Sequence, residues 1–166
     1  MDVKKYRRRL PHILVPGSLY FLTFRLAPQQ GHSLAEEERS ALSAHIGRAG
    51  PGHCRAFVIM PDHVHLLYQS VAEEDLRKTL HALKSSSAHS LAHRFGRCAP
   101  IWQDETYDHI VRNEKEMLET WKYIEANPIR RGLASHPCEY PWSSAFCSAL
   151  GTGDAAGGGR ATEKLP

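Results

Sequence analysis

The fold of this chain is decided by residues 54–69, which read CRAFVIMPDHVHLLYQ. Residues 54–60 are rich in apolar and β-branched side chains and favour a strand. Pro61 and Asp62 favour a tight turn, and residues 63–69 return as a second apolar strand. The stretch therefore predicts an antiparallel hairpin, whose two strands we expect at the centre of a sheet.

The strand and helix before this hairpin can be predicted from residue propensities, a capping residue and a helix-breaking segment. Residues 19–25, LYFLTFR, favour a buried strand because they are aromatic and β-favouring. Ser33 is a candidate N-cap for a helix that carries Leu42 and Ile46 on its apolar face. Residues 50–52, Gly-Pro-Gly, end that helix.

The elements after the hairpin complete the layout. Residues 73–95 show the leucine spacing of a long amphipathic helix, and residues 107–112 favour a short strand. Asn113 caps a helix over residues 114–127, which Pro128 is expected to stop. The order strand, helix, strand, strand, helix, strand, helix predicts an α+β fold, with helices packed on an antiparallel sheet.

Length and composition suggest one domain with two distinctive ends. We expect residues 1–148 of the 166-residue chain to form a single domain that begins with a basic arm at residues 4–9. Residues 151–166 are rich in glycine and lack a large apolar residue until Leu165, which predicts a disordered tail over residues 149–166.

The overall composition narrows the class of protein. The formal net charge of +3 permits nucleic-acid binding without requiring it. The chain has no apolar run of about 18 residues and no signal-peptide pattern, so we expect a cytoplasmic protein. The four cysteines form no Cys-x-x-Cys pair, which argues against a structural zinc ribbon.

His63 and His65 are the first candidates for chemistry. Two residues apart on a predicted strand, they project from the same face and could form half of a site for a divalent ion. The alternative is a pair of ordinary strand histidines on a solvated face. The strongly apolar flanking residues favour a site, because a core hairpin seldom places two ionisable groups on one face without partners.

Tyr123 and Asn127 are the second pair of candidates. They are four residues apart on a predicted helix and therefore lie on one helical face. The amide oxygen of Asn127 suits Mg²⁺ or Mn²⁺, and Tyr123 would then lie one turn from a metal-bound phosphate. A core tyrosine and an asparagine that ends the helix are an equally good interpretation of these residues.

A set of ordered motifs spans about residues 7–146. The motifs are LPHI (10–13), YFLTF (20–24), MPDHVHLL (60–67), IWQ (101–103), YDHIVR (107–112), YIEANP (123–128), GL (132–133) and YPWSS (140–144). This ordered set resembles the REP-associated tyrosine transposases, which are relatives of the IS200/IS605 single-tyrosine transposases in the histidine–hydrophobic–histidine (HUH) superfamily. The His-x-His motif alone would be weak, whereas the whole set is specific.

The resemblance implies a fold, a site and a substrate. The implied fold is the HUH endonuclease fold, a ferredoxin-like antiparallel sheet with helices packed on it. By position, His63, His65 and Asn127 would hold Mg²⁺ or Mn²⁺, and Tyr123 would be the nucleophile that forms a 5′-phosphotyrosine. The implied substrate is single-stranded DNA next to a hairpin such as a REP palindrome. Many relatives have Asn where this chain has Asp62, a difference from which we expect no chemical consequence.

One rival nucleophile and several DNA contacts can also be predicted. Tyr107 is the rival, although it has no helical partner at the required spacing. The candidate DNA-binding residues are Arg7, Arg8, Arg9, Lys84, Arg130 and Arg131. The arginines of the N-terminal arm are the best of these, because clustered charges release counterions from DNA. For each of the others a solvated surface position is the alternative.

The sequence leaves three functional hypotheses. The leading one is a metal-dependent, transposase-like enzyme that nicks and rejoins single-stranded DNA near hairpins. The alternative in another class is a catalytically silent, domesticated protein that only binds hairpin DNA. The third is a nickase of replication or plasmid transfer, a group that commonly places its tyrosine elsewhere. A monomer and a homodimer both remain open.

Overall fold

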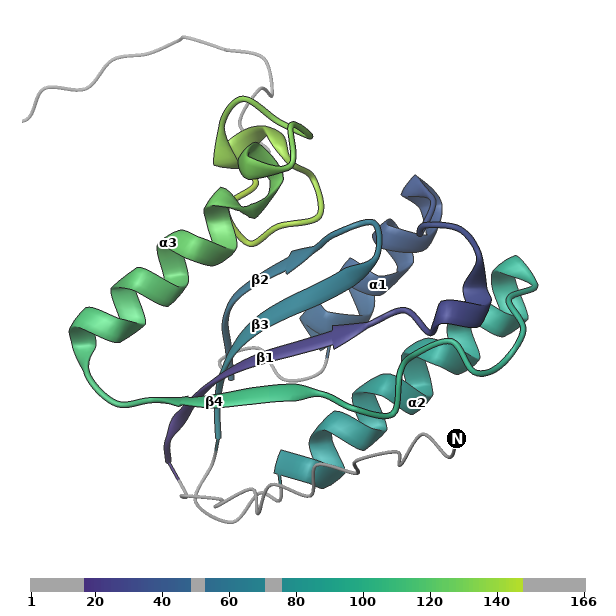
Figure 1. Cartoon of the computed structure of the whole chain (residues 1–166), viewed down its shortest axis with the longest axis horizontal. Helices are drawn as coiled ribbons and strands as arrows, with labels where there is room; N and C mark the ends of the chain where they lie inside the picture. Colours follow the sequence, from purple (N-terminus) through teal and green to yellow (C-terminus); the bar gives the residue numbers. More distant parts are fainter. Residues whose placement is uncertain (1–16, 49–52, 71–75, 148–166) are drawn as a thin grey trace, which may run out of the picture.

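The computed structural model describes residues 17–48, 53–70 and 76–147 (Figure 1). The elements are β1 (Leu19–Arg25), α1 (Glu36–Arg48), β2 (Cys54–Ile59), β3 (His63–Gln69), α2 (Leu76–Phe95), β4 (Tyr107–Val111) and α3 (Glu114–Arg130), with short 3-10 helices at Pro28–Gln30 and Pro137–Glu139. The predicted basic arm, the Gly-Pro-Gly segment, the first residues of the long helix and the predicted tail lie outside the described residues. Within the described ranges, no helix has the length and apolar character needed to span a membrane.

The four strands form one antiparallel sheet in the order β2-β3-β1-β4. With α1 between β1 and β2 and α2 between β3 and β4, this is the ferredoxin-like arrangement that the resemblance implies. The prediction that both hairpin strands are central is wrong, because β2 lies at an edge. The crossover through α1 leaves room for one strand beside β1, and the hairpin folds β3 into that space.

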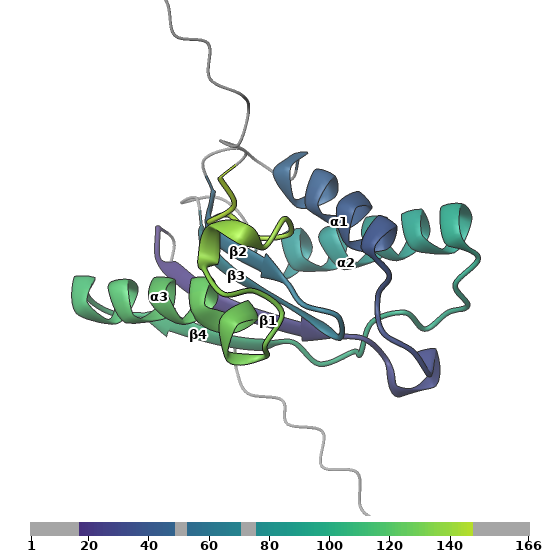
Figure 2. The ribbon, with the colours of Figure 1, turned by 90° about the horizontal axis from the view of Figure 1, so that it is seen from above.

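The sheet separates two layers of helices. Figure 2 shows α1 and α2 on one side of the sheet and α3 on the other. Tyr20, Leu22 and Phe24 of β1 join Leu66 of β3 in the larger core, beneath α1 and α2. The residues between them point towards α3, where Ile124 contributes to a smaller core. Alternate residues of β1 and β3 therefore belong to different environments.

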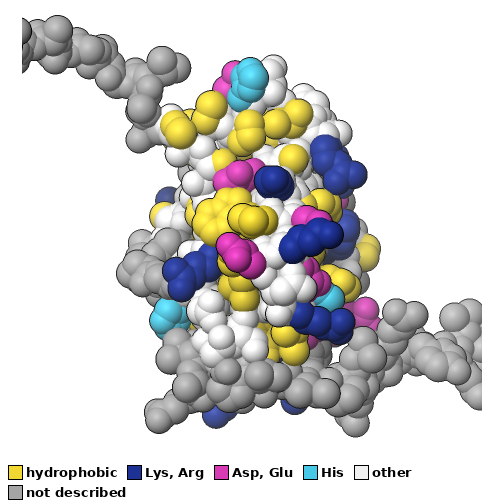
Figure 3. Space-filling view, turned by 90° about the vertical axis from the view of Figure 1, so that its left-hand side faces the viewer, with side chains coloured by type: hydrophobic (Ala, Val, Ile, Leu, Met, Phe, Trp, Pro, Cys, Tyr) yellow, Lys and Arg dark blue, Asp and Glu magenta, His cyan; other side chains and the backbone are white. Residues whose placement is uncertain are grey.

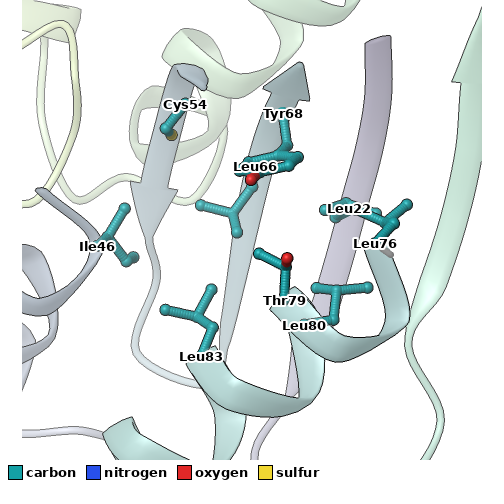
Figure 4. A pocket seen from close by; sticks show the side chains of 9 residues that line it. All are labelled: Leu22, Ile46, Cys54, Leu66, Tyr68, Leu76, Thr79, Leu80 and Leu83. Atoms are coloured by element: carbon teal, nitrogen blue, oxygen red, sulfur yellow. The ribbon is translucent and has the colours of Figure 1, made fainter. Parts of the chain in front are cut away.

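A small apolar pocket lies on the α1–α2 side of the sheet. Figure 4 shows Leu22 and Leu66 from the sheet, Ile46 from α1 and Leu83 from α2 around it. Cys54 also lines this pocket, and burial raises the pKa of its thiol to about 11, so the thiol stays protonated at neutral pH. The lining carries no charged side chain, and we assign the pocket to the core.

The last helix begins as predicted and ends later than predicted. The side chain of Asn113 caps α3 by accepting a hydrogen bond from the Glu116 N–H. Pro128 does not stop the helix, which continues to Arg130. Because Pro128 lies in the last turn, its missing N–H removes one intrahelical bond and leaves the following ones intact. Gly132, with a φ of 67°, then reverses the chain.

Candidate active site

His63 and His65 lie side by side on the face of β3 that is turned towards α3. Their exposed fractions are 2% and 4%, and their ring centroids are 4.6 Å apart. The shared direction follows from the two-residue period of a strand. The alternative of two histidines on a solvated face is wrong, because both rings are buried.

Each histidine is held through its Nδ1 atom. Nδ1 of His63 donates to the Asp62 carboxylate over 2.7 Å, and Nδ1 of His65 lies 2.7 Å from Oγ1 of Thr23. Donation to the carboxylate leaves Nε2 of His63 with a lone pair, which is how metal-binding histidines are commonly oriented. When Nδ1 of His65 donates to the Thr23 hydroxyl, Nε2 of His65 carries a lone pair in the same way. The Asp62 carboxylate therefore orients the His63 ring, a role that we did not expect from the sequence.

Both imidazoles are neutral at neutral pH. Burial lowers the pKa of His65 from 6.5 to about 3, and the neighbouring His63 and Arg25 shift it in the same direction. Burial also lowers the pKa of His63, although the hydrogen bond to Asp62 opposes this effect. Neutral imidazoles can bind a cation without first losing a proton. The pair is therefore in the protonation state that a metal site needs.

Tyr123 brings α3 to the histidines, and Asn127 lies one turn further along this helix. The ring of Tyr123 packs edge-on against His65, with 5.4 Å between centroids, and the residue remains 40% exposed. Asn127 is buried and donates through Nδ2 to the Tyr123 carbonyl over 3.3 Å. Oδ1 of Asn127 has no hydrogen-bond partner among the described residues and is available to a ligand. The interpretation of a core tyrosine and a helix-ending asparagine is wrong, since Tyr123 is exposed and α3 continues past Asn127.

Phe21 lies between this tyrosine and the rival candidate. Tyr107 is exposed on β4, and its ring meets Phe21 at 6.1 Å between centroids, whereas Phe21 meets Tyr123 at 5.8 Å. Since β4 pairs with β1 and β1 pairs with β3, Tyr107 is two strands away from the histidines. Its neighbour His109 hydrogen-bonds through Nε2 to Glu116 of α3. The site thus brings together Tyr123 with the histidines and leaves Tyr107 at its margin.

Two of the predicted DNA contacts lie close to the site. The guanidinium of Arg130 lies 5.5 Å from the centre of the Tyr123 ring. Arg131 pairs with Asp62 at 3.9 Å between Nη2 and Oδ2. Both side chains are therefore beside the residues that the sequence groups as a catalytic site.

Lys84 lies elsewhere. It belongs to α2 on the other side of the sheet, and its ammonium donates to the carbonyl oxygens of Gln103 and Asp104 over 2.6 and 3.1 Å. Burial lowers the pKa of this ammonium. These bonds give Lys84 a structural role in tying α2 to the segment before β4. Arg7, Arg8 and Arg9 lie outside the described residues.

Sequence reasoning missed two residues of this face, Thr23 and Arg25. In the antiparallel register, Thr23 is directly opposite His65 and Arg25 is directly opposite His63. Their two-residue spacing on β1 was visible, but only the register shows which residues they face.

Comparison with known proteins first identifies the protein family. Residues 36–127, more than half of the chain, match the family described as Transposase IS200 like. The chain therefore belongs to this transposase family, as the resemblance indicated.

Particular relatives narrow the assignment. The REP-associated tyrosine transposase of Escherichia coli (strain K12) is 23% identical over 145 residues, which cover 86% of this chain and 82% of that protein. A protein of Haemophilus influenzae, provisionally named a REP-associated tyrosine transposase, is 30% identical over 141 residues, covering 77% and 80%. The resemblance to REP-associated tyrosine transposases is thus confirmed over most of the chain.

A solved structure has the same fold. It is described as a REP-associated tyrosine transposase bound to a REP hairpin, and it superposes with a TM-score of 0.68 at 22% identity. The match covers 97% of this chain and 100% of the other. The predicted fold class is therefore confirmed.

Proposed function

We propose that this transposase-family protein cuts and rejoins single-stranded DNA beside a hairpin, with Tyr123 as its nucleophile. The observation that carries the proposal is the position of Tyr123, a half-exposed tyrosine whose ring touches the buried, neutral His65. A tyrosine hydroxyl has a pKa of about 10 and needs assistance to attack a phosphodiester. The neighbouring donor atoms are suited to hold a cation that gives this assistance.

The donor set suits Mg²⁺ or Mn²⁺. The candidate ligand atoms are Nε2 of His63, Nε2 of His65 and Oδ1 of Asn127, to which no side chain or backbone group of the described residues is hydrogen-bonded. Within the described residues, no group of three His, Cys, Asp or Glu side chains could hold a metal, so a carboxamide is the natural third ligand. A bound divalent ion would supply charge neutralisation at the scissile phosphate.

The chain's own residues account for the remaining chemistry. Oη of Tyr123 forms a bond to phosphorus while the bond to the 3′-oxygen breaks, which leaves a 5′-phosphotyrosine and a 3′-hydroxyl. The phenolic proton passes to solvent, to which Tyr123 is open, and the leaving 3′-oxygen takes up a proton from solvent. Rejoining is the reverse attack by a 3′-hydroxyl, with the tyrosine oxygen as leaving group. The ester conserves the bond energy, and so no nucleotide cofactor is required.

The hairpin substrate rests on the relatives. One solved relative is described as bound to a REP hairpin, and we extend that substrate class to this chain.

The test is formation of a covalent protein–DNA adduct. End-labelled hairpin oligonucleotides from repeats flanking the coding region would be incubated with Mn²⁺ or Mg²⁺ and resolved on denaturing gels. We expect a metal-dependent adduct with wild type and with Tyr107→Phe, and none with Tyr123→Phe or with His63→Ala/His65→Ala. Loss of the adduct only in Tyr107→Phe would reassign the nucleophile. Tight hairpin binding without an adduct from any variant would favour the catalytically silent binding protein.

A further inference from the structure

Charge on one side of the molecule is mixed in sign (Figure 3), whereas two positive side chains meet near the site. Figure 3 shows basic and acidic side chains interspersed on the side of the molecule at the left of Figure 1. Opposite charges so close together largely cancel. At the rim of the histidine face, however, Arg25 and Arg131 converge on a single carboxylate, that of Asp62.

These two arginines reach the rim from different elements. Arg25 ends β1 directly opposite His63, and Arg131 is the C-cap residue of α3. Their side chains are each 52% exposed. The rim therefore joins the strand that faces the histidines to the helix that carries Tyr123.

Arg25 and Arg131 lie near Asp62 but do not form hydrogen bonds with its carboxylate. Nη1 of Arg25 and Nη2 of Arg131 lie 3.7 and 3.9 Å from Oδ2 of Asp62. Both distances exceed that of a hydrogen bond, so the guanidinium N–H groups keep their donors for another partner. The other carboxylate oxygen, Oδ1, is occupied by Nδ1 of His63.

The charge balance of this rim favours an anion. Two guanidinium groups face one carboxylate. These three side chains therefore carry one net positive charge at the edge of the His63–His65 face. Guanidinium groups match the geometry of phosphate oxygens and stay charged at every relevant pH.

We propose that Arg25 and Arg131 together bind one backbone phosphate of the DNA strand as it crosses the His63–His65 face. Asp62 holds both side chains at the rim before DNA arrives. The inference rests on the proposed function to the extent that DNA enters this face. It adds Arg25 to the predicted contact Arg131 and assigns both side chains to one phosphate.

The test measures binding without chemistry. Fluorescence anisotropy of a labelled hairpin oligonucleotide with a single-stranded extension would be followed in the Tyr123→Phe background, with chelator present, over a series of salt concentrations. Arg25→Ala/Arg131→Ala should lower the affinity by about 10- to 100-fold at low salt. The slope of log affinity against log salt should shrink by about 0.7, the value for one phosphate of a single strand.

A matched control removes two positive charges from α2, on the other side of the sheet. Lys78→Ala/Arg94→Ala changes two exposed cations of α2 and should leave the affinity and the slope near those of the parent. Arg25→Lys/Arg131→Lys should recover the salt slope but only part of the affinity, because lysine lacks the guanidinium fork.

Two results would overturn the inference. One is an Arg25→Ala/Arg131→Ala variant that matches the control double variant in affinity and slope. The other is a loss of affinity with an unchanged salt slope, which would indicate damage to the surface and not loss of a phosphate contact. An adduct that persists in Tyr123→Phe would contradict the proposed nucleophile while leaving this binding comparison valid, so the two failures are distinguishable.

Discussion

The two faces of the central strands differ in what they contribute. On the α1–α2 face, Tyr20, Leu22 and Leu66 form a continuous apolar core. On the α3 face, alternate positions of the same strands place Thr23 and His65 in contact. A shift of one residue in the pairing would exchange the two sets, so the apolar face fixes the register on which the polar face depends.

The largest expected effect on stability lies on the apolar face. Leu66→Ala should lower the free energy of unfolding by about 2–5 kcal/mol, because it removes buried methyl groups and leaves a cavity. Tyr123→Phe on the other face should change it by no more than about 0.5 kcal/mol, because the altered side chain is half exposed. Urea denaturation of both variants measures the difference, and similar losses would contradict the assignment of separate roles to the two faces.

The next largest effect concerns metal binding and depends on the hydrogen bond between Asp62 and His63. Asp62→Ala should weaken Mn²⁺ binding by about 10- to 100-fold in the absence of DNA, because the imidazole loses the partner that fixes its tautomer. Asp62→Asn should retain most of the affinity, since its amide oxygen can still accept the Nδ1 hydrogen. Isothermal titration calorimetry with Mn²⁺ checks both variants, and an unaffected Asp62→Ala protein would remove Asp62 from the site.

The buried histidines should make stability depend on pH. The pKa of His65 is about 3 in the folded protein and about 6.5 when the residue is exposed, so the unfolded chain binds more protons in this window. The free energy of unfolding should therefore fall as the pH decreases from 6.5 towards 3, by at most about 1.4 kcal/mol per pH unit from this residue. His65→Gln should flatten the profile measured by urea denaturation, whereas parallel profiles would contradict the shifted pKa.

The smallest effect separates Lys84 from the DNA-binding residues. Lys84→Met should cost about 1 kcal/mol of stability, because it loses hydrogen bonds to the carbonyls of Gln103 and Asp104. Its affinity for the hairpin oligonucleotide should stay within about two-fold of the parent, since α2 covers the other face. A loss as large as that of Arg25→Ala/Arg131→Ala would restore Lys84 as a DNA contact.

Most of the fold could be predicted from local patterns. The strand periodicity placed His63 and His65 on one face, and the helical spacing placed Tyr123 and Asn127 together. The edge position of β2 and the continuation of α3 past Pro128 could not be predicted in this way. The first depends on how the crossover through α1 packs, and the second on where in the last turn the proline lies.

By itself the sequence determined the strands and helices, the pairing of like-facing residues within each element, and, through its ordered motifs, the transposase family. Only the tertiary structure decided which residues of different elements meet. It placed Thr23 opposite His65, brought Arg25 and Arg131 to Asp62, and turned Lys84 away from the site. The physical reason is that these contacts join residues far apart in the chain, 42 positions for Thr23 and His65. Strand register and helix packing set such contacts through the burial of the whole core, which no local period encodes.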